Sequence, residues 1–202
     1  MKIAIILNSP EKIRVKEMTE NEIIYADGGY SNAKYFKDRK TLAVVGDFDT
    51  LSKVPENEKV IKLNREKDFT DGERAIYYAK EIGADEVCIY GAFGGKPEHI
   101  LGNLTLLKTA WKAGLKASAK YGGRTIKLLP RGKYEIKVKK GGSFSFIPFG
   151  KNVCFGKSDG LYYPLDNLTL TPYDTRGISN IALSDKIEFI ILKGETIAVY
   201  EY

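Results

Sequence analysis

The sequence contains few of the residues on which several common kinds of protein site depend. In 202 residues it has two cysteines, Cys88 and Cys154, and one histidine, His99. Two cysteines inside apolar runs provide neither a disulfide framework nor a zinc motif, and they predict small buried side chains. A single histidine excludes a metal site built from several histidines, and it nearly excludes a Ser-His-Asp triad.

Long apolar runs are also missing. Residues 3–7 are apolar, but they are too few for the hydrophobic part of a secretory signal, and no cleavage site follows them. No run approaches the length of a transmembrane helix. We therefore expect a cytoplasmic protein in which residues 2–7 form a buried strand.

Charge of one sign is not in large excess. The chain has 32 Lys and Arg against 26 Asp and Glu, which gives a net charge of +6. This excess suits an anionic partner, whether ATP or nucleic acid, and does not choose between them. Because no basic cluster is interleaved with aromatic residues, the nucleic-acid alternative rests on net charge alone.

Apolar runs alternate with helical patterns in the first part of the chain. A strand followed by a helix, repeated, favours a mainly parallel sheet with helices on its faces. The expected strands are residues 2–7, 23–26, 42–45, 59–63 and 86–90, and the expected helices are residues 32–37, 72–82 and 97–113.

The pattern changes after Gly122-Gly123, and no convincing helix follows. Short strands with frequent turns favour a β-sandwich. We therefore predict an α/β N-terminal domain (1–122) with a mainly parallel sheet flanked by helices, followed by an all-β sandwich C-terminal domain (123–202). The expected later strands are residues 134–139, 143–149, 168–171, 186–192 and 196–200.

Two carboxylates, Asp47 and Asp49, directly follow the buried strand expected at residues 42–45. Ligands of open α/β sheets bind beyond the carboxyl ends of strands. The two acids repel each other unless a cation lies between them, and Mg²⁺ carrying phosphates is the natural ligand. The alternative is a solvated turn. Thr50 comes one position too early for an aspartyl-phosphatase motif, whereas the Asp-x-Asp motif of glycosyltransferases stays open.

Paired glycines follow a strand end at Asp27-Gly28-Gly29. Glycines let backbone N–H groups approach a phosphate closely, and a plain turn is the alternative.

A helix start is indicated at Thr70 and Glu73, which have the spacing of a capping box. Asp71 in the first turn suits the helix dipole. The cap does not account for Asp68, and it leaves the Asp71 carboxylate available for a metal. Lys67 is either a phosphate ligand or a surface lysine.

A second helix start is indicated at Gly94-Gly95-Lys96-Pro97. Glycines and a cation before a helix N-terminus favour an anion site. Pro97 suits the first helical position, and it excludes a P-loop, which needs Ser or Thr there.

Taken in order, these segments resemble the thiamine pyrophosphokinase family. That family has an Asp-Gly-Gly-like turn, then Gly-Asp-Phe-Asp-Ser, then Lys-Asp-x-Thr-Asp. Gly-Gly-Arg-x-Asp-His then opens a helix that continues with Leu-x-Asn-Leu, and a Ser-Asn-Glu-like loop comes late. The matching segments are residues 27–29, 46–50, 67–71, 94–99 with 101–104, and 178–180.

The chain departs from the family pattern at four positions. Thr50 replaces Ser and keeps the hydroxyl, and Ile181 stands where Glu is usual. Lys96 replaces Arg, which loses the two-pronged grip on phosphate, and Glu98 replaces Asp on a longer arm. These changes leave two alternatives open: a thiamine- or nucleotide-binding protein of the same fold without this activity, or a pyrophosphokinase acting on another alcohol.

The resemblance implies transfer of pyrophosphate from ATP to the hydroxyethyl group of thiamine, which gives thiamine diphosphate and AMP. It also implies a homodimer with active sites between subunits. The implied residues are Asp47, Asp49 and Asp71 as Mg²⁺ ligands and catalytic groups, assisted by Asp68; Asp27, Gly28, Gly29, Lys67, Lys96 and Arg176 for ATP and its phosphates; and Glu98, Ser179 and Asn180 for thiamine.

Overall fold

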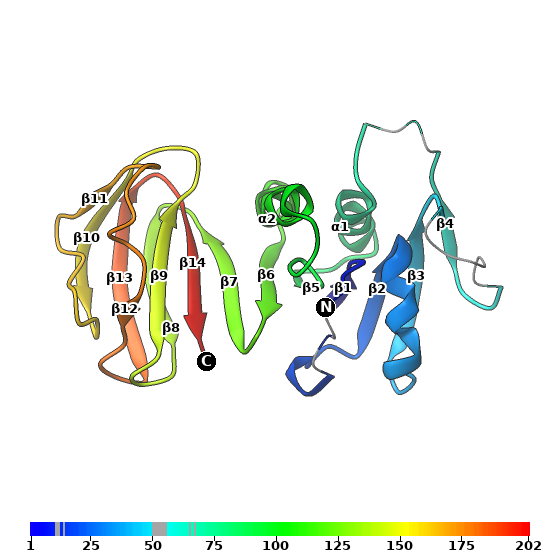
Figure 1. Cartoon of the computed structure of the whole chain (residues 1–202), viewed down its shortest axis with the longest axis horizontal. Coiled ribbons are helices and arrows are strands. Elements are labelled where there is room, and N and C mark those ends of the chain that lie inside the picture. Colours follow the sequence, from blue (N-terminus) through cyan, green and yellow to red (C-terminus); the bar gives the residue numbers. More distant parts are fainter. Residues whose placement is uncertain (11–12, 14, 50–55, 65, 67) are drawn as a thin grey trace. The chain divides into compact units, whose positions relative to one another are not determined.

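The computed structural model describes residues 1–202 except 11–12, 14, 50–55, 65 and 67 (Figure 1). Thr50 and Lys67 of the predicted site therefore lie outside the described residues. The chain divides into two compact units, Met1–Tyr121 and Gly122–Tyr202. No helix in the described part of the chain is long and apolar enough to cross a membrane.

The first unit is built on a parallel sheet with the strand order β6-β5-β1-β2-β3-β4. Residues Ile3, Ala4, Ile5 and Ile6 are all 0% exposed, so both faces of the central strand are covered. Such strands are continuous apolar runs because neither face meets water. The strands are β1 (Lys2–Ile6), β2 (Glu22–Ala26), β3 (Lys40–Gly46), β4 (Val60–Lys62), β5 (Glu86–Tyr90) and β6 (Lys116–Tyr121).

Helices cover this sheet. α1 (Asp71–Glu81) packs on β1, β2 and β3 and against α2 (Pro97–Lys112), which packs on β6. A 3-10 helix, η2 (Asp27–Tyr35), also packs on β1, β2 and β3, and a short 3-10 turn, η1 (Val15–Glu17), precedes β2. The helix expected at residues 32–37 is therefore wrong in type and in extent. The chain winds into η2 directly from the end of β2.

A buried carboxylate, Glu20, ties the segment before β2 to two strands. Its Oε1 lies 2.9 Å from Nζ of Lys2, and its Oε2 accepts a 2.9 Å hydrogen bond from the Tyr90 hydroxyl. Burial alone would raise the pKa of Glu20. The Lys2 ammonium and the Tyr90 hydroxyl outweigh burial, so the pKa of Glu20 lies below its usual range.

We expect Glu20→Gln to lower the free energy of unfolding by about 2 kcal/mol near neutral pH, because it removes a buried charged acceptor from Lys2 and Tyr90. Because the pKa of Glu20 is lower in the folded than in the unfolded protein, the ionised Glu20 stabilises the fold fully above the unfolded pKa. This stabilisation is lost as the pH falls through the folded pKa. Denaturant unfolding at roughly pH 7 and pH 3 should therefore show the difference shrinking in acid.

The matched control for this prediction is Glu22→Gln. Glu22 pairs with Lys40 at 3.2 Å on the surface, so we expect a cost below about 0.5 kcal/mol. An equal loss for both variants, or a Glu20→Gln loss independent of pH, would contradict the role of the buried carboxylate.

The second unit is a sandwich of two antiparallel sheets, with strand orders β12-β9-β14-β7 and β11-β10-β13-β8. Rings from both sheets meet between them: Phe146 of β9 contacts Phe155 of β10 and Phe189 of β13 at centroid distances of 5.2 and 5.0 Å. The predicted fold class is confirmed. The strands are β7 (Arg124–Leu129), β8 (Gly132–Lys137), β9 (Ser143–Pro148), β10 (Val153–Asp159), β11 (Thr169–Leu170), β12 (Asn180–Ile181), β13 (Lys186–Lys193) and β14 (Thr196–Glu201).

Candidate functional site

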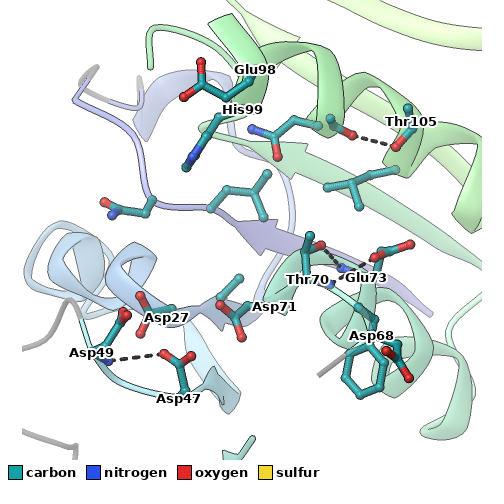
Figure 2. Close-up of a pocket in the computed structure, with 17 residues that line it drawn as sticks. Asp27, Asp47, Asp49, Asp68, Thr70, Asp71, Glu73, Glu98, His99 and Thr105 are labelled. Carbon is teal, nitrogen blue, oxygen red and sulfur yellow. Dashed lines mark hydrogen bonds between the residues drawn. The ribbon is translucent and has the colours of Figure 1, made fainter. Parts of the chain in front are cut away.

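Three carboxylates gather where β2 and β3 end. The two strands are parallel neighbours with Ala26 opposite Val45, so the residues that follow them leave the sheet at the same edge. Carboxylate oxygens of Asp27, Asp47 and Asp49 all lie within 4.8 Å of one another (Figure 2). Grouped carboxylate oxygens are the donor set of a hard cation such as Mg²⁺, so these residues fit that ion.

The backbone at both strand ends is unusual. Asp27 has φ of 42° and Phe48 has φ of 63°, which lie in the left-handed region that favours glycine. A bulky residue stays there only where its surroundings enforce it, and such strain is concentrated at functional sites. Phe48 is 7% exposed and packs in the core cluster with Tyr25. Phe48 is therefore held in the core while the carboxylates on either side of it line a pocket.

Glycine at position 46 makes room for Asp27. A Cβ atom on Gly46 would lie 2.9 Å from Cβ and 3.2 Å from Oδ1 of Asp27, which is closer than such atoms normally approach. The glycine that ends β3 therefore allows Asp27 to lie close to the two acids that follow.

The pocket has a volume of about 780 Å³ and lies within the first unit. Asp68 lines it from the segment before α1 and Asp71 from the first residue of α1. Glu98 and His99 line it from the first turn of α2 (Figure 2). No lysine or arginine in the described part of the chain lines it, and Lys96 is exposed. Carboxylates outnumber basic groups in the described lining of the pocket, so a bound cation would reduce the repulsion among them.

The structure groups Asp27, rather than Asp71, with Asp47 and Asp49. Asp71 lines the same pocket, and its role as a third metal ligand stays a prediction. The neighbouring cap is confirmed: Thr70 Oγ1 accepts from the Glu73 amide at 3.2 Å, and Glu73 Oε2 accepts from the Thr70 amide at 3.0 Å. Asp68 also lines the pocket, and Figure 2 shows its carboxylate apart from the group of three.

The other predicted residues lie in the second unit. Arg176 is exposed, and its Nη2 donates to a main-chain carbonyl at 3.4 Å. Ser179 has φ of 62°, and its amide donates to Oγ of Ser145 at 3.0 Å. Asn180 is 5% exposed; it accepts from the Tyr163 amide at 3.0 Å and donates to the Tyr163 carbonyl at 2.7 Å. Its amide thus holds the Tyr163 segment in place, and direct contact with a substrate stays a prediction.

Sequence reasoning missed two contributions to the site. It assigned Asp27 to the nucleotide and not to the cation group, although the parallel pairing of β2 and β3 was a usable signal. It assigned no role to Asn103, which lines the pocket and donates to the Ala92 carbonyl at 3.0 Å. The position of Asn103 in a helix gave no signal for that contact, which reaches back to the loop before the helix.

Two families of domains match this chain. The thiamin pyrophosphokinase catalytic domain matches residues 15–119, and the thiamin pyrophosphokinase vitamin B1 binding domain matches residues 133–194. Thiamine pyrophosphokinase of Bacillus subtilis (strain 168) is 32% identical over 162 residues, which cover 76% of this chain and 75% of that protein.

Solved structures agree with these matches. A crystal structure of thiamine pyrophosphokinase from Bacillus subtilis, 26% identical, superposes with a TM-score of 0.88 and covers 100% of this chain and 99% of that chain. Thiamin pyrophosphokinase from Candida albicans, 15% identical, shares the fold with a TM-score of 0.81 over 99% of this chain and 88% of that chain. From its domain matches and its curated relative, this chain belongs to the thiamin pyrophosphokinase family.

Proposed function

We propose that this protein is an ATP-dependent diphosphotransferase that moves a pyrophosphoryl group from ATP to the hydroxyethyl group of thiamine and releases AMP. One observation carries the proposal: Asp27, Asp47 and Asp49 converge within 4.8 Å at the carboxyl edge of a parallel sheet. Family membership supplies thiamine and ATP as the substrates to test.

Asp27, Asp47 and Asp49 would hold Mg²⁺, with Asp71 and Asp68 in the same pocket to bind or orient its ligands. The bound ion would neutralise charge on the phosphate oxygens. Phosphoryl-type transfer leaves little covalent chemistry to the protein, so the pocket acts by positioning the reactants and by electrostatic stabilisation.

The remaining residues would position the substrates. Lys96, Lys67 and Arg176 would offset phosphate charge, and Gly28 and Gly29 with Asp27 would border the nucleotide. Glu98, Ser179 and Asn180 would hold thiamine. In this proposal residues 1–122 bind ATP and Mg²⁺, residues 123–202 bind thiamine, and the active sites form between the subunits of a cytoplasmic homodimer.

The test is incubation of the purified protein with ATP, Mg²⁺ and thiamine, followed by chromatographic detection of AMP and thiamine diphosphate. We expect both products in equal amounts, and neither when thiamine is omitted or EDTA is added. Because Lys96 and Glu98 depart from the family pattern, a panel of other alcohols, including a pterin, is run in parallel. AMP formation with another alcohol but not with thiamine would identify that alcohol as the acceptor. Absence of AMP with every alcohol would favour the alternative of a thiamine- or nucleotide-binding protein without this activity.

A further inference from the structure

The loop of residues 91–96 joins β5 to α2 and brings Glu98 and His99 to the pocket wall. The N-cap of α2 is Lys96, whose side chain makes no capping hydrogen bond within the described part of the chain, whereas Thr70 caps α1 with a complete capping box. Capping side chains normally help to fix where a helix begins. Pro97 at the first helical position favours a helix start there, and side chains from outside the loop hold the segment that precedes it.

Two side chains from outside the loop hold its main chain. Asn103, in the second turn of α2, donates from Nδ2 to the Ala92 carbonyl at 3.0 Å. Ser9 donates from Oγ to the Phe93 carbonyl at 2.6 Å. Ser9 belongs to the segment that leaves β1, where its neighbour Asn8 lines the pocket. These bonds therefore tie the loop to the helix that follows it and to the segment after β1.

The first residue of the loop, Gly91, lies close to the segment that follows β1. Gly91 has φ of 75°, and a Cβ atom there would lie 2.6 Å from the Leu7 carbonyl oxygen and 3.2 Å from Cβ of Ser9. Ala92 is 2% exposed, whereas the loop from Gly94 to Lys96 is exposed. The base of the loop is thus fixed and buried, and its tip is open to ligands.

We propose that Ser9 and Asn103 are positioning residues, which hold the base of this loop so that Lys96 and the first turn of α2 meet the phosphates of a bound nucleoside triphosphate. They act through the Ala92 and Phe93 carbonyls, to which their side chains donate hydrogen bonds. The proposal rests on the proposed function and extends it to two residues outside the predicted phosphate and metal ligands.

The test uses Ser9→Ala, Asn103→Ala, the double variant and Ser9→Thr, which keeps the hydroxyl. A displacement of about 1 Å at a binding loop can cost up to 10²-fold in rate, so we expect each alanine variant to raise KM for ATP or lower kcat by about tenfold. Ser9→Thr should restore most of the loss. Because both residues hold one loop, the double variant should lose less than the product of the single losses.

Thr109→Ala is the matched control on the same helix. Thr109 Oγ1 lies 3.5 Å from the Thr105 carbonyl, so the change removes a side chain-to-backbone contact that does not involve the loop. Kinetic constants of Thr109→Ala should stay within about twofold of the parent, because substitutions away from functional contacts have small effects.

Hydrogen exchange measured by mass spectrometry makes the test independent of turnover. In both alanine variants, amides of residues 91–96 should exchange faster, while peptides from β1 and β2 keep the parent rates. Either of two results would overturn the proposal. One is unchanged exchange of the loop amides in the alanine variants, and the other is an active parent protein whose alanine variants have the same kinetic constants. Inactivity of the parent would contradict only the proposed function, since loop exchange would still decide the role of the two residues.

Discussion

Asp49→Asn should lower kcat/KM for ATP on the order of 10³-fold. The substitution removes one charge from the group proposed to hold a cation, which would stabilise the negative charge that develops on the phosphates. Asp49 is the exposed member of the group, whereas Asp27 is buried and Asp47 half-buried. The Asp49 amide that donates to Asp47 Oδ1 at 3.3 Å is unchanged by the substitution. The loss of kcat/KM should therefore come from the missing charge and not from a changed loop conformation.

A thermal-denaturation series with and without MgCl₂ separates charge loss from unfolding. Without Mg²⁺, Asp49→Asn should be at least as stable as the parent, because one of three mutually repelling carboxylates is gone. Added Mg²⁺ should raise Tm of the parent by mass action and leave Tm of the variant nearly unchanged. Asp38→Asn is the matched control: this exposed acid of the same unit contacts Arg39 and lies outside the pocket.

Asp71→Asn, measured in the same denaturation series, tests whether Asp71 or Asp27 is the third Mg²⁺ ligand. Loss of the Mg²⁺-dependent rise in Tm would place Asp71 in the ion's coordination. Retention of that rise, together with slower turnover, would leave Asp27 as the third ligand and Asp71 as a group acting on the substrate. Parental turnover in a folded Asp49→Asn variant would contradict the metal site itself.

Gly29→Ala should cost about 4 kcal/mol or more in the free energy of unfolding, or prevent folding of the first unit, because overpacking against a rigid backbone is severely destabilising. An added Cβ atom would lie 2.2 Å from the Ile6 carbonyl oxygen and 2.9 Å from the Ile6 carbonyl carbon. Both partners are buried, one in η2 and the other at the end of β1. Neither main chain can move aside without disturbing the sheet.

Gly102→Ala is the control that adds the same methyl group. Gly102 lies in α2, and an added Cβ atom would have no described neighbour within 4 Å. Replacing an exposed helical glycine by alanine should raise the free energy of unfolding by about 0.5–1 kcal/mol. Urea unfolding followed by circular dichroism compares the two variants. A Gly29→Ala protein of parental stability would show that η2 can move away from β1.

The Gly29 result also bears on what the paired glycines do. The sequence interpretation was that Gly28 and Gly29 let the backbone approach a phosphate. The structure gives Gly29 a separate reason to be glycine, namely close packing of η2 on the Ile6 carbonyl. A phosphate contact through the same segment stays a prediction, and stability measured without nucleotide distinguishes the two roles.

Local sequence determined most of the architecture. Apolar runs marked the buried strands, and alternation marked the sandwich strands, because the period of side chains follows directly from strand geometry. The capping box at Thr70 and Glu73 and the acids after β3 were also visible, since caps and strand ends are properties of short segments. Strands β6, β7, β10 and β12 are not among the expected ones. The β6 sequence, Lys-Ala-Ser-Ala-Lys-Tyr, is half polar, although Ser118 in it is only 3% exposed. The expected helix at residues 32–37 begins too late because η2 starts at Asp27-Gly28-Gly29, whose residues are typical of a turn.

Only the tertiary structure decided which distant residues meet. Strand order and register bring Asp27 to Asp47 and Asp49, and close packing requires glycine at positions 29 and 46. The fold also turns Asn180 onto the Tyr163 backbone and Asn103 onto the Ala92 carbonyl. The physical reason is that a residue's own segment sets its conformation and the face it occupies. The neighbours on that face come from strand pairing and helix packing, which involve segments far apart in the sequence.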